Sequence, residues 1–230
     1  MKEFIKSVIF KLGYQLNKKK PFFDFIGNKI DLVFDVGAHK GGFAKIIRKD
    51  GFLKKIVSFE PQAKEFLELQ SLVKKDNNWF LHKRCALGAK NGIQDLNILS
   101  ETQCSSLLEP NKNSLDFDDN FKKINTEKCE VWSLDYIIEN YYNLTKNAYL
   151  KIDTQGYDRY VLDGCKNNIK KFKFIQIEAG LYSLYENEET YEYYINFFEK
   201  IGFTVWDLKP FAYHKSGRLV QFDIIFKNDV

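Results

Sequence analysis

The stretch Asp31-Leu32-Val33-Phe34-Asp35-Val36-Gly37-Ala38-His39-Lys40-Gly41-Gly42-Phe43 decides the fold of this chain. Leu32 to Val36 is a short apolar run broken only by Asp35, and the residues from Phe43 to Lys49 have helical spacing. A glycine-rich turn joins the two, which predicts a strand, a tight turn and a helix. Glycines let the backbone approach a ligand closely, and the start of a helix offers free N–H groups. The stretch therefore predicts a binding turn, with Asp35 facing a crevice.

The spacing of the glycines and the strand that follows indicate the kind of ligand. A dinucleotide-binding turn reads Gly-x-Gly-x-x-Gly, and its middle glycine makes room for a pyrophosphate. In this chain His39 occupies the position of that glycine. A ligand without phosphates fits this turn better. Ile56 to Phe59 is a second apolar strand that ends at Glu60-Pro61, where a carboxylate can accept hydrogen bonds from both hydroxyls of a ribose. The turn and Glu60 together suggest S-adenosylmethionine, whereas the turn alone also fits a strand-to-helix corner that binds nothing.

Strands and helices alternate along most of the chain, which predicts a parallel sheet with helices on both faces. The expected strands are residues 32–36, 56–59, 79–81, 148–152, 174–177, 203–208 and 219–226. The clearest expected helices are residues 65–75, with leucines at helical spacing, and 189–201, which ends before Gly202. The last two strands should form a hairpin through residues 209–218. The fold class is therefore α/β, with seven strands and an antiparallel final pair.

The middle of the chain holds the segments expected to cover the ligand. Cys85-Ala86-Leu87-Gly88 is expected to be a small-residue turn, which either admits the adenine ring or is a plain turn. Residues 92–100 and 130–133 are expected strands, and the polar stretch from Thr102 to Lys128 between them is typical of a lid or substrate loop. Within this stretch, Cys104-Ser105-Ser106-Leu107 is the part expected over the cofactor.

Asp153 is the first candidate for catalysis. It follows the strand at 148–152, so its carboxylate should point into the crevice where an activated methyl group is presented. The alternative is that Asp153 caps the helix that starts near Tyr157. The chain lacks the Pro-Pro-aromatic motif common here in enzymes that methylate amines of bases, which favours an oxygen acceptor. Glu178 ends the next strand, and His214, in the last loop, either reaches the site as base or substrate contact or is simply solvated.

The charge distribution and the cysteines limit the classes of function. Residues 1–29 hold seven lysines against Glu3 and Asp24, a net charge of +5 where the whole chain has +4, which leaves −1 for residues 30–230. A near-neutral domain argues against a nucleic-acid partner. The four cysteines are far apart, which predicts neither a zinc site nor a disulfide framework and fits a reduced, cytoplasmic protein. We expect neither an export signal nor a membrane-spanning segment.

The chain is expected to divide into a basic amphipathic segment, residues 1–29, and one domain, residues 30–230. Apolar residues recur in the segment at helical spacing with lysines between them: Phe4, Ile5, Val8, Ile9, Leu12 and Leu16. Such a helix packs on the domain or on a partner subunit, which includes a second copy of the chain, or it attaches to an anionic lipid surface.

Taken together, these segments resemble the FkbM family of S-adenosylmethionine-dependent methyltransferases, from about Asp31 to Lys227. The motifs that carry the resemblance are Phe34-Asp35-Val36-Gly37-Ala38-His39-Lys40-Gly41, Phe59-Glu60-Pro61, Leu150-Lys151-Ile152-Asp153-Thr154-Gln155-Gly156, Ile175-Gln176-Ile177-Glu178 with Leu184-Tyr185-Glu186, and Gln221-Phe222-Asp223-Ile224-Ile225-Phe226. The resemblance implies a Rossmann-like class I methyltransferase sheet. It also implies O-methylation, often of sugars of surface polysaccharides or of glycosylated natural products. Some members have Glu where this chain has Gln155, so a role that needs charge at this position does not carry over.

The resemblance and the motifs give a set of candidate site residues. Cofactor contacts are expected at Asp35, Gly37, Ala38, His39, Gly41, Glu60, Pro61, Ala86, Ser105 and Ser106, and catalysis at Asp153, Glu178 and His214. A divalent cation held by paired carboxylates is possible but is not required, so no metal ligand is assigned. The expected acceptor is a sugar or a nucleotide-activated sugar, with a small natural product as the alternative. An NAD-dependent oxidoreductase and a non-catalytic cofactor-binding subunit are the rival classes.

Overall fold

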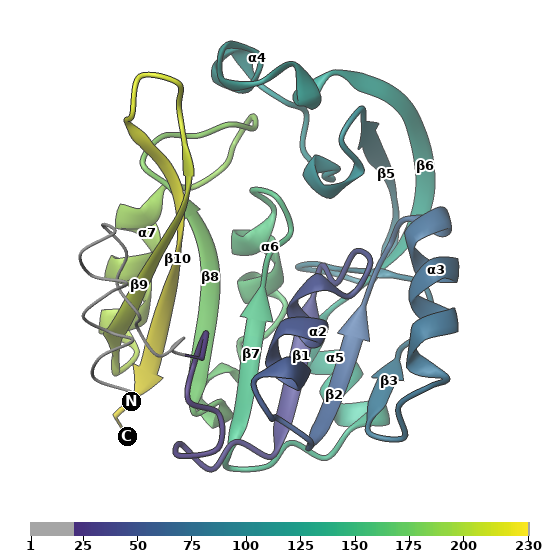
Figure 1. Cartoon of the computed structure of the whole chain (residues 1–230), viewed down its shortest axis with the longest axis vertical. Coiled ribbons are helices and arrows are strands. Elements are labelled where there is room, and N and C mark those ends of the chain that lie inside the picture. The colour runs from purple at the N-terminus through teal and green to yellow at the C-terminus, as the bar shows by residue number, and fades with distance from the viewer. Residues whose placement is uncertain (1–20, 230) are drawn as a thin grey trace, which may run out of the picture.

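The computed structural model describes residues 21–229, and its main element is a sheet of seven strands (Figure 1). The strands are β1 (Leu32–Val36), β2 (Lys55–Phe59), β3 (Trp79–Leu81), β7 (Ala148–Ile152), β8 (Phe174–Gly180), β9 (Phe203–Tyr213) and β10 (Leu219–Asn228). They lie in the order β3-β2-β1-β7-β8-β10-β9. The first five are parallel, and β10 runs antiparallel to both β8 and β9. The predicted seven-stranded α/β sheet with an antiparallel final pair is confirmed.

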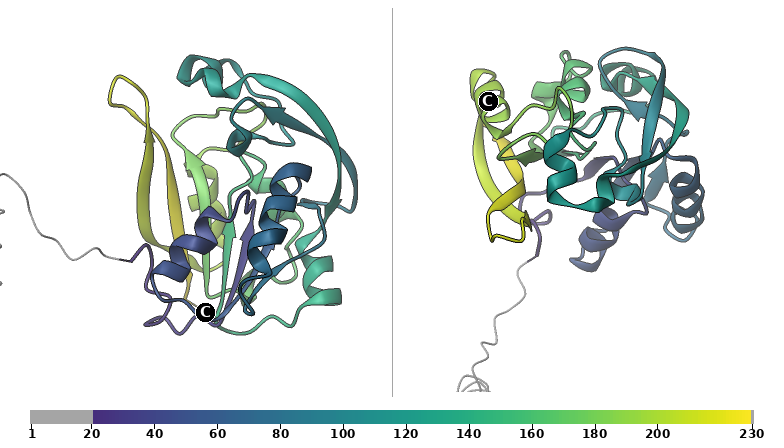
Figure 2. Two further views of the ribbon diagram at one scale, coloured as in Figure 1. Left: turned by 45° about the vertical axis from the view of Figure 1, so that its right-hand side comes forward. Right: turned by 90° about the horizontal axis from the view of Figure 1, so that it is seen from above.

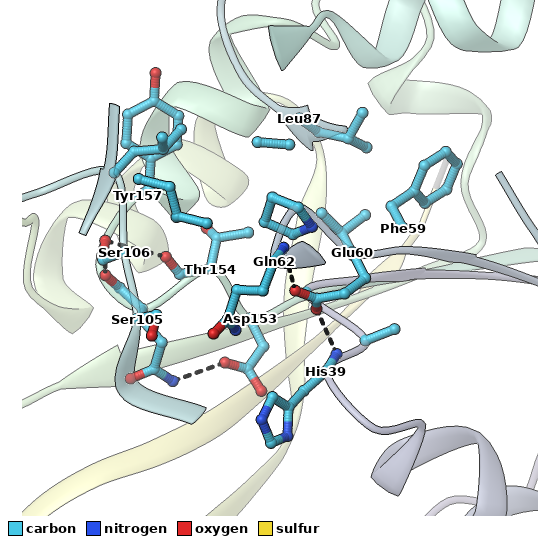
Figure 3. Close-up of a pocket in the computed structure, with 18 of the residues that line it drawn as sticks. His39, Phe59, Glu60, Gln62, Leu87, Ser105, Ser106, Asp153, Thr154 and Tyr157 are labelled. Carbon is cyan, nitrogen blue, oxygen red and sulfur yellow. Dashed lines mark hydrogen bonds between the residues drawn. The ribbon is translucent and has the colours of Figure 1, made fainter. Parts of the chain in front are cut away.

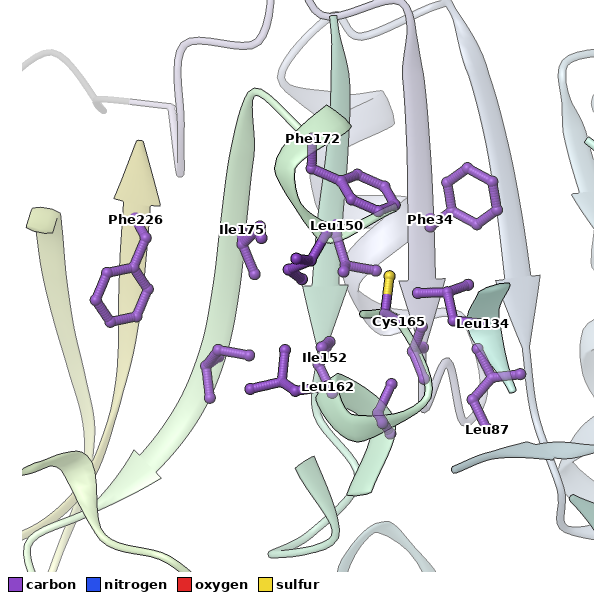
Figure 4. Close-up of a cluster of buried hydrophobic side chains, with 14 of the residues drawn as sticks. Phe34, Leu87, Leu134, Leu150, Ile152, Leu162, Cys165, Phe172, Ile175 and Phe226 are labelled. Carbon is purple, nitrogen blue, oxygen red and sulfur yellow. The ribbon is translucent and has the colours of Figure 1, made fainter. Parts of the chain in front are cut away.

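Helices cover both faces of this sheet, as predicted (Figure 1). On one face, α2 (Gly42–Lys49) and α3 (Ala63–Val73) pack on alternate strand residues such as Val33. On the other face, α5 (Leu134–Tyr141), α6 (Asp158–Asp163) and α7 (Tyr191–Lys200) pack on the residues between, such as Phe34 and Leu150 (Figure 4). A short 3-10 helix, η3 (Ile169–Lys171), leads into β8. Because side chains of a strand alternate between faces, a strand buried on both sides reads as the continuous apolar run seen in β1.

A second sheet, which the sequence did not predict, stands beside the main one. It contains β4 (Ala86–Leu87), β6 (Lys123–Trp132) and β5 (Gly92–Leu99) in that order. The expected turn at Cys85–Gly88 is wrong, because Ala86 and Leu87 form a strand parallel to the end of β6. The expected strand at 130–133 begins seven residues earlier, since β6 pairs with the whole of β5 from Lys123 onward. The polar stretch expected to be a loop therefore ends in a strand.

The segment between β5 and β6 crosses the carboxyl edge of the main sheet. It contains η1 (Thr102–Cys104), α4 (Lys112–Phe117) and η2 (Asp119–Phe121). Asn111 holds it in place, since its side-chain amide donates to the carbonyls of Ser183 and Tyr185. Seen from above, α4 lies between the β9–β10 hairpin and the β5–β6 ribbon (Figure 2). The segment is therefore positioned over the strand ends, where the predicted lid would act.

Residues 21–29, which were expected to precede the domain boundary at residue 30, pack on the domain. Phe23 and Phe25 are buried, and both rings contact Tyr149. The ammonium group of Lys173 donates to the carbonyl of Asn28. Residues 21–29 are thus part of the domain, whereas the predicted amphipathic helix at residues 4–16 lies outside the described residues. Among residues 21–229, no helix has the length and apolar character needed to span a bilayer.

Candidate functional site

A cavity lies at the carboxyl ends of β1, β2 and β7, beneath the β5–β6 segment (Figure 3). It holds about 820 Å³ of empty space, including its opening to solvent. The strands that follow β1 in the sequence, β2 and β3, lie on one side of it in the sheet, and β7 and the later strands lie on the other side. Ligands of open α/β sheets bind at such a switch point. The topology therefore places the cavity where a cofactor is expected.

The turn after β1 forms the floor of the cavity. Gly37 has a φ of 76° and His39 a φ of 47°, both in the left-handed region. The N–H groups of Gly37 and Ala38 both donate to the carbonyl of Phe59, at 3.1 Å and 3.0 Å, which fixes the turn against the end of β2. A side chain at residue 37 would put its Cβ 1.8 Å from the carbonyl oxygen of Asp153. Glycine is therefore required at this position for both reasons.

Glu60 presents a buried carboxylate to the cavity from the end of β2. Only 2% of its surface is exposed, and its Oε2 accepts from the N–H of His39 at 2.6 Å while Oε1 accepts from the N–H of Gln62 at 2.8 Å. Burial raises the pKa of Glu60 to about 7, although these two N–H groups act to lower it. Each carboxylate oxygen can accept a second hydrogen bond. Glu60 thus remains able to bind two hydroxyl groups of a ligand.

Asp153 and Glu178 are joined by the side-chain amide of Gln155. Its Nε2 donates to Oδ1 of Asp153 at 2.9 Å and to Oε1 of Glu178 at 3.1 Å, and Gln221 also donates to this Oε1. The phenol of Tyr185 donates to Oε1 of Gln155. Burial, followed by the nearby Asp153 charge, raises the pKa of Glu178 well above its usual value. The surroundings of Glu178 therefore favour its neutral form.

Lys151 lies below Asp153 on the same face of β7. Its Nζ is 3.1 Å from Oδ2 of Asp153 and 3.5 Å from Oδ1 of Asp35. Asp35 is completely buried, and burial raises its pKa in spite of Lys151. The expectation that Asp35 faces the crevice is therefore wrong, because it lies under the floor and supports Lys151.

The structure brings most of the predicted site residues to one cavity. Its lining includes Gly37, Ala38, His39, Glu60, Pro61, Ala86, Ser105, Ser106 and Asp153. Glu178 lies behind Asp153 rather than in the lining. Gly41 is also outside the lining, because it packs against Trp79 and Leu69.

His214 is separate from the cavity. It lies in the tip of the β9–β10 hairpin, where Nδ1 is 2.8 Å from the hydroxyl of Ser216, and it lines another hollow with Tyr182 and Arg218. The prediction that His214 reaches the site is corrected by this placement, because β9 continues to Tyr213 and carries the loop past the sheet edge.

Several lining residues were not singled out from the sequence. They are Gln62, Lys151, Thr154, Gln155 and Tyr157. Oε1 of Gln62 and Oγ1 of Thr154 are buried and accept or donate no hydrogen bond within residues 21–229. Lys151 could have been singled out from the sequence, because a charged residue within a buried strand requires a partner of opposite charge.

The carboxylates of the site already have donor partners. Both oxygens of Asp153 contact nitrogen donors, from Lys151 and Gln155, and Oε1 of Glu178 accepts two amide N–H groups. Among residues 21–229, no group of three or more His, Cys, Asp or Glu side chains is arranged to hold a metal ion. The donor set at this cavity, within residues 21–229, therefore does not fit a divalent cation, which binds through several free oxygens.

Comparison with solved structures gives weak similarities. The M. capricolum TrmK complex with S-adenosyl-homocysteine is 9% identical, with 90% of this chain and 68% of that chain covered and a TM-score of 0.48. An rRNA methylase from Streptococcus thermophilus is 12% identical, with coverage of 93% and 99% and a TM-score of 0.48. The LepI complex with SAM is 10% identical, with coverage of 98% and 52% and a TM-score of 0.49. Similarity at this level says nothing about substrate.

Comparison at the level of sequence families is decisive. No curated protein matches this chain. The family model described as "Methyltransferase FkbM domain" matches residues 35–205, which is well over half of the sequence and includes the turn, Glu60, Asp153 and Glu178. The resemblance predicted from the motifs is thereby confirmed, and the chain belongs to the FkbM methyltransferase domain family.

Proposed function

We propose that this protein is an S-adenosylmethionine-dependent O-methyltransferase. The observation that carries the proposal is the Glu60 carboxylate, which is held at the cavity by two backbone N–H groups and keeps free lone pairs toward it. The residues present fit the cofactor. Glu60 would accept from the ribose hydroxyls, and Pro61, Ala86 and Leu87 offer an apolar wall for adenine. The unpartnered Oε1 of Gln62 gives the cavity a free polar atom.

The bound cofactor would supply a methyl group on a sulfonium sulfur, for in-line transfer to an oxygen nucleophile with the neutral thioether S-adenosylhomocysteine as the leaving group. The protein has to align the acceptor and remove its proton, because a sugar hydroxyl does not ionise unaided at pH 7. We assign proton removal to Asp153, which lines the cavity and is 22% exposed. Glu178, whose neutral form burial favours, is linked to Asp153 through the amide of Gln155 and helps to orient that carboxylate. Asp153 thus accepts the proton while Glu178 and Gln155 hold it in place.

The acceptor we propose is a sugar hydroxyl, on a nucleotide-activated sugar or a surface glycoconjugate. The near-neutral charge of residues 30–230 supports a small acceptor over a nucleic acid. A small natural product is the second candidate for the same chemistry. A subunit that binds the cofactor without catalysis would have no use for the Asp153–Gln155–Glu178 arrangement at the cavity.

The first test is calorimetric titration with S-adenosylhomocysteine and, separately, with NAD. We expect S-adenosylhomocysteine to bind and NAD not to bind, because His39 fills the position that a pyrophosphate needs. A panel of nucleotide-activated sugars is then assayed for methyl transfer from labelled S-adenosylmethionine. Binding of NAD instead, or of neither ligand, would contradict the proposed cofactor.

The affinity for S-adenosylhomocysteine should depend on pH through Glu60. Its pKa, raised by burial to about 7, means that the carboxylate forms mainly as the pH rises from 6 to 8. The charged form is the better acceptor for ribose hydroxyls, so affinity should rise by up to about tenfold over this interval and level off above it. Calorimetry at pH 6, 7 and 8 measures this effect. In Glu60→Gln the rise should disappear, and an equal rise in that variant would assign the titration to another group.

A further inference from the structure

A row of buried polar side chains crosses the main sheet directly beneath the cavity. Ser58, Asp35 and Lys151 are register partners on β2, β1 and β7, so their side chains share one face. The hydroxyl of Ser58 donates to Asp35 at 3.2 Å. Two residues earlier on β1 and β7, Val33 and Tyr149 belong to the apolar cluster under α2 and α3. A charged pair inserted in such a face costs desolvation energy, which points to a purpose other than packing.

Lys151 supplies the positive charge of this row. It is 5% exposed, and its ammonium group contacts Asp153 at 3.1 Å, Asp35 at 3.5 Å and the carbonyl oxygen of Gly37 at 3.4 Å. Burial alone would lower the pKa of Lys151, but the charges of Asp153 and Asp35 raise it above its usual value. The amine therefore remains an ammonium ion throughout the physiological range. One side chain thus connects the turn under the cofactor position to the carboxylate at the acceptor position.

Burial shifts the pKa of the surrounding titratable groups toward their neutral forms. Those that face Lys151 and Asp153 from β1, β8, β10, α6 and the turn after β1 are Asp35, Glu178, Asp223, Asp158 and His39. Burial is the largest cause of the pKa shift in each, and it raises the pKa of the four acids and lowers that of the histidine. Asp153 makes the shorter of the two contacts with Lys151 and is the carboxylate that lines the cavity. The ammonium charge is therefore directed at the group that meets the acceptor.

We propose that Lys151 is a positioning residue for methyl transfer, which holds the Asp153 carboxylate at a fixed place relative to the turn at Gly37. The inference rests on the proposed function, since it assigns Asp153 the removal of a proton. The lysine supplies beside this carboxylate the fixed positive charge that a metal ion supplies in other sites. Because the cation is part of the chain, treatment with EDTA should leave the rate of methyl transfer unchanged.

The test is a carboxyl ¹³C NMR spectrum of the full chain at pH 7, in which the Asp153 signal is identified by its loss in Asp153→Asn. In Lys151→Met, this signal should shift and broaden, because the carboxylate loses the ammonium group that fixes its place. Lys173→Met is the matched control, because Lys173 donates to Asn28 and Asn147 at the opposite end of the sheet, and it should leave the Asp153 signal unmoved. An unmoved Asp153 signal in Lys151→Met overturns the proposal. If that variant does not fold, Lys151→Gln, which keeps a donor without charge, decides the question.

Turnover separates positioning from stability once the sugar panel has given an acceptor. In Lys151→Met, kcat should fall about 100-fold or more, while the KM for S-adenosylmethionine should change less than about threefold. A purely structural lysine would lower the unfolding temperature without separating kcat from KM, and that outcome also overturns the proposal. The two proposals fail separately. Absence of S-adenosylhomocysteine binding to the wild-type chain rejects the proposed function, whereas the NMR comparison tests the role of Lys151 without any ligand.

Discussion

Gly37→Ala should abolish binding of S-adenosylhomocysteine and lower the unfolding temperature by several degrees or more. The left-handed φ of 76° costs an alanine about 1–2 kcal/mol by itself. The added Cβ would also lie 1.8 Å from the carbonyl oxygen of Asp153, well inside van der Waals contact. Neither backbone can move freely, since the N–H of Gly37 donates to Phe59 and the N–H of Asp153 donates to Val36. The overlap must therefore push β1 and β7 apart at the centre of the site.

Thermal unfolding and calorimetry check this prediction, with Gly42→Ala as the control. Gly42 belongs to the same turn, but a Cβ there meets nothing within 4 Å, and its φ is not positive. Alanine is a better helix former than glycine at the start of α2, so the unfolding temperature of this control should be equal or slightly higher. Two variants with the same stability as the wild type would show that the turn tolerates a side chain at both positions. That result would contradict the close approach of residue 37 to Asp153.

The main sheet was predictable because its strands carry local signals. β1 and β3 have the predicted boundaries, and β7 and the start of β8 do as well, because buried parallel strands are short apolar runs. In the second sheet, β5 was expected at residues 92–100, but β4 and most of β6 lacked such signals. Most of the first residues of β6, from Lys123, are polar and exposed, so neither face of the strand leaves an apolar pattern. β4 is two residues long, and only its pairing with β6 makes it a strand.

The candidate site was predictable to the extent that topology fixes it. Carboxylates at the ends of parallel strands meet at one edge of the sheet, which located Glu60, Asp153 and Glu178 without knowledge of any contact. What the sequence could not show is the register across the sheet. The pairing of Asp35 with Lys151 depends on which residues of β1 and β7 lie opposite each other. Because of this register, Asp35, which was predicted to contact the cofactor, is instead a buried partner of Lys151.

The amide of Gln155 illustrates the same limit. Gln155 has a left-handed φ of 54°. Its amide joins two carboxylates that follow or end separate strands, and neither feature can be read from the motif alone. A glutamate at this position would place a third carboxylate between two others, where repulsion is strong. A glutamine instead donates to both of them. Gln155, which stands where some family members have a glutamate, thus stabilises the pair of Asp153 and Glu178 in this chain.

Asp153→Asn should lower kcat for methyl transfer by about 100- to 10,000-fold, the range attributed to a positioned general base. The substitution keeps the shape of the side chain but removes its capacity to accept a proton. Binding of S-adenosylhomocysteine should change less than about threefold, because Glu60 and the turn at Gly37 stay in place. The amide must also turn its NH₂ group toward Lys151 or Gln155, both donors, so a small loss of stability is expected.

Glu178→Gln is the comparison that separates a base from a supporting acid. Burial and the nearby Asp153 raise the pKa of Glu178, which favours its neutral form, and an amide of the same size can keep a donor toward Asp153. We therefore expect kcat of Glu178→Gln to fall less than about tenfold. Steady-state kinetics at saturating cofactor, with thermal unfolding of each variant, measures both effects. Near-normal turnover in Asp153→Asn would remove the base assignment, whereas equal large losses in both variants would mean that the two carboxyl groups share the proton and act as one unit.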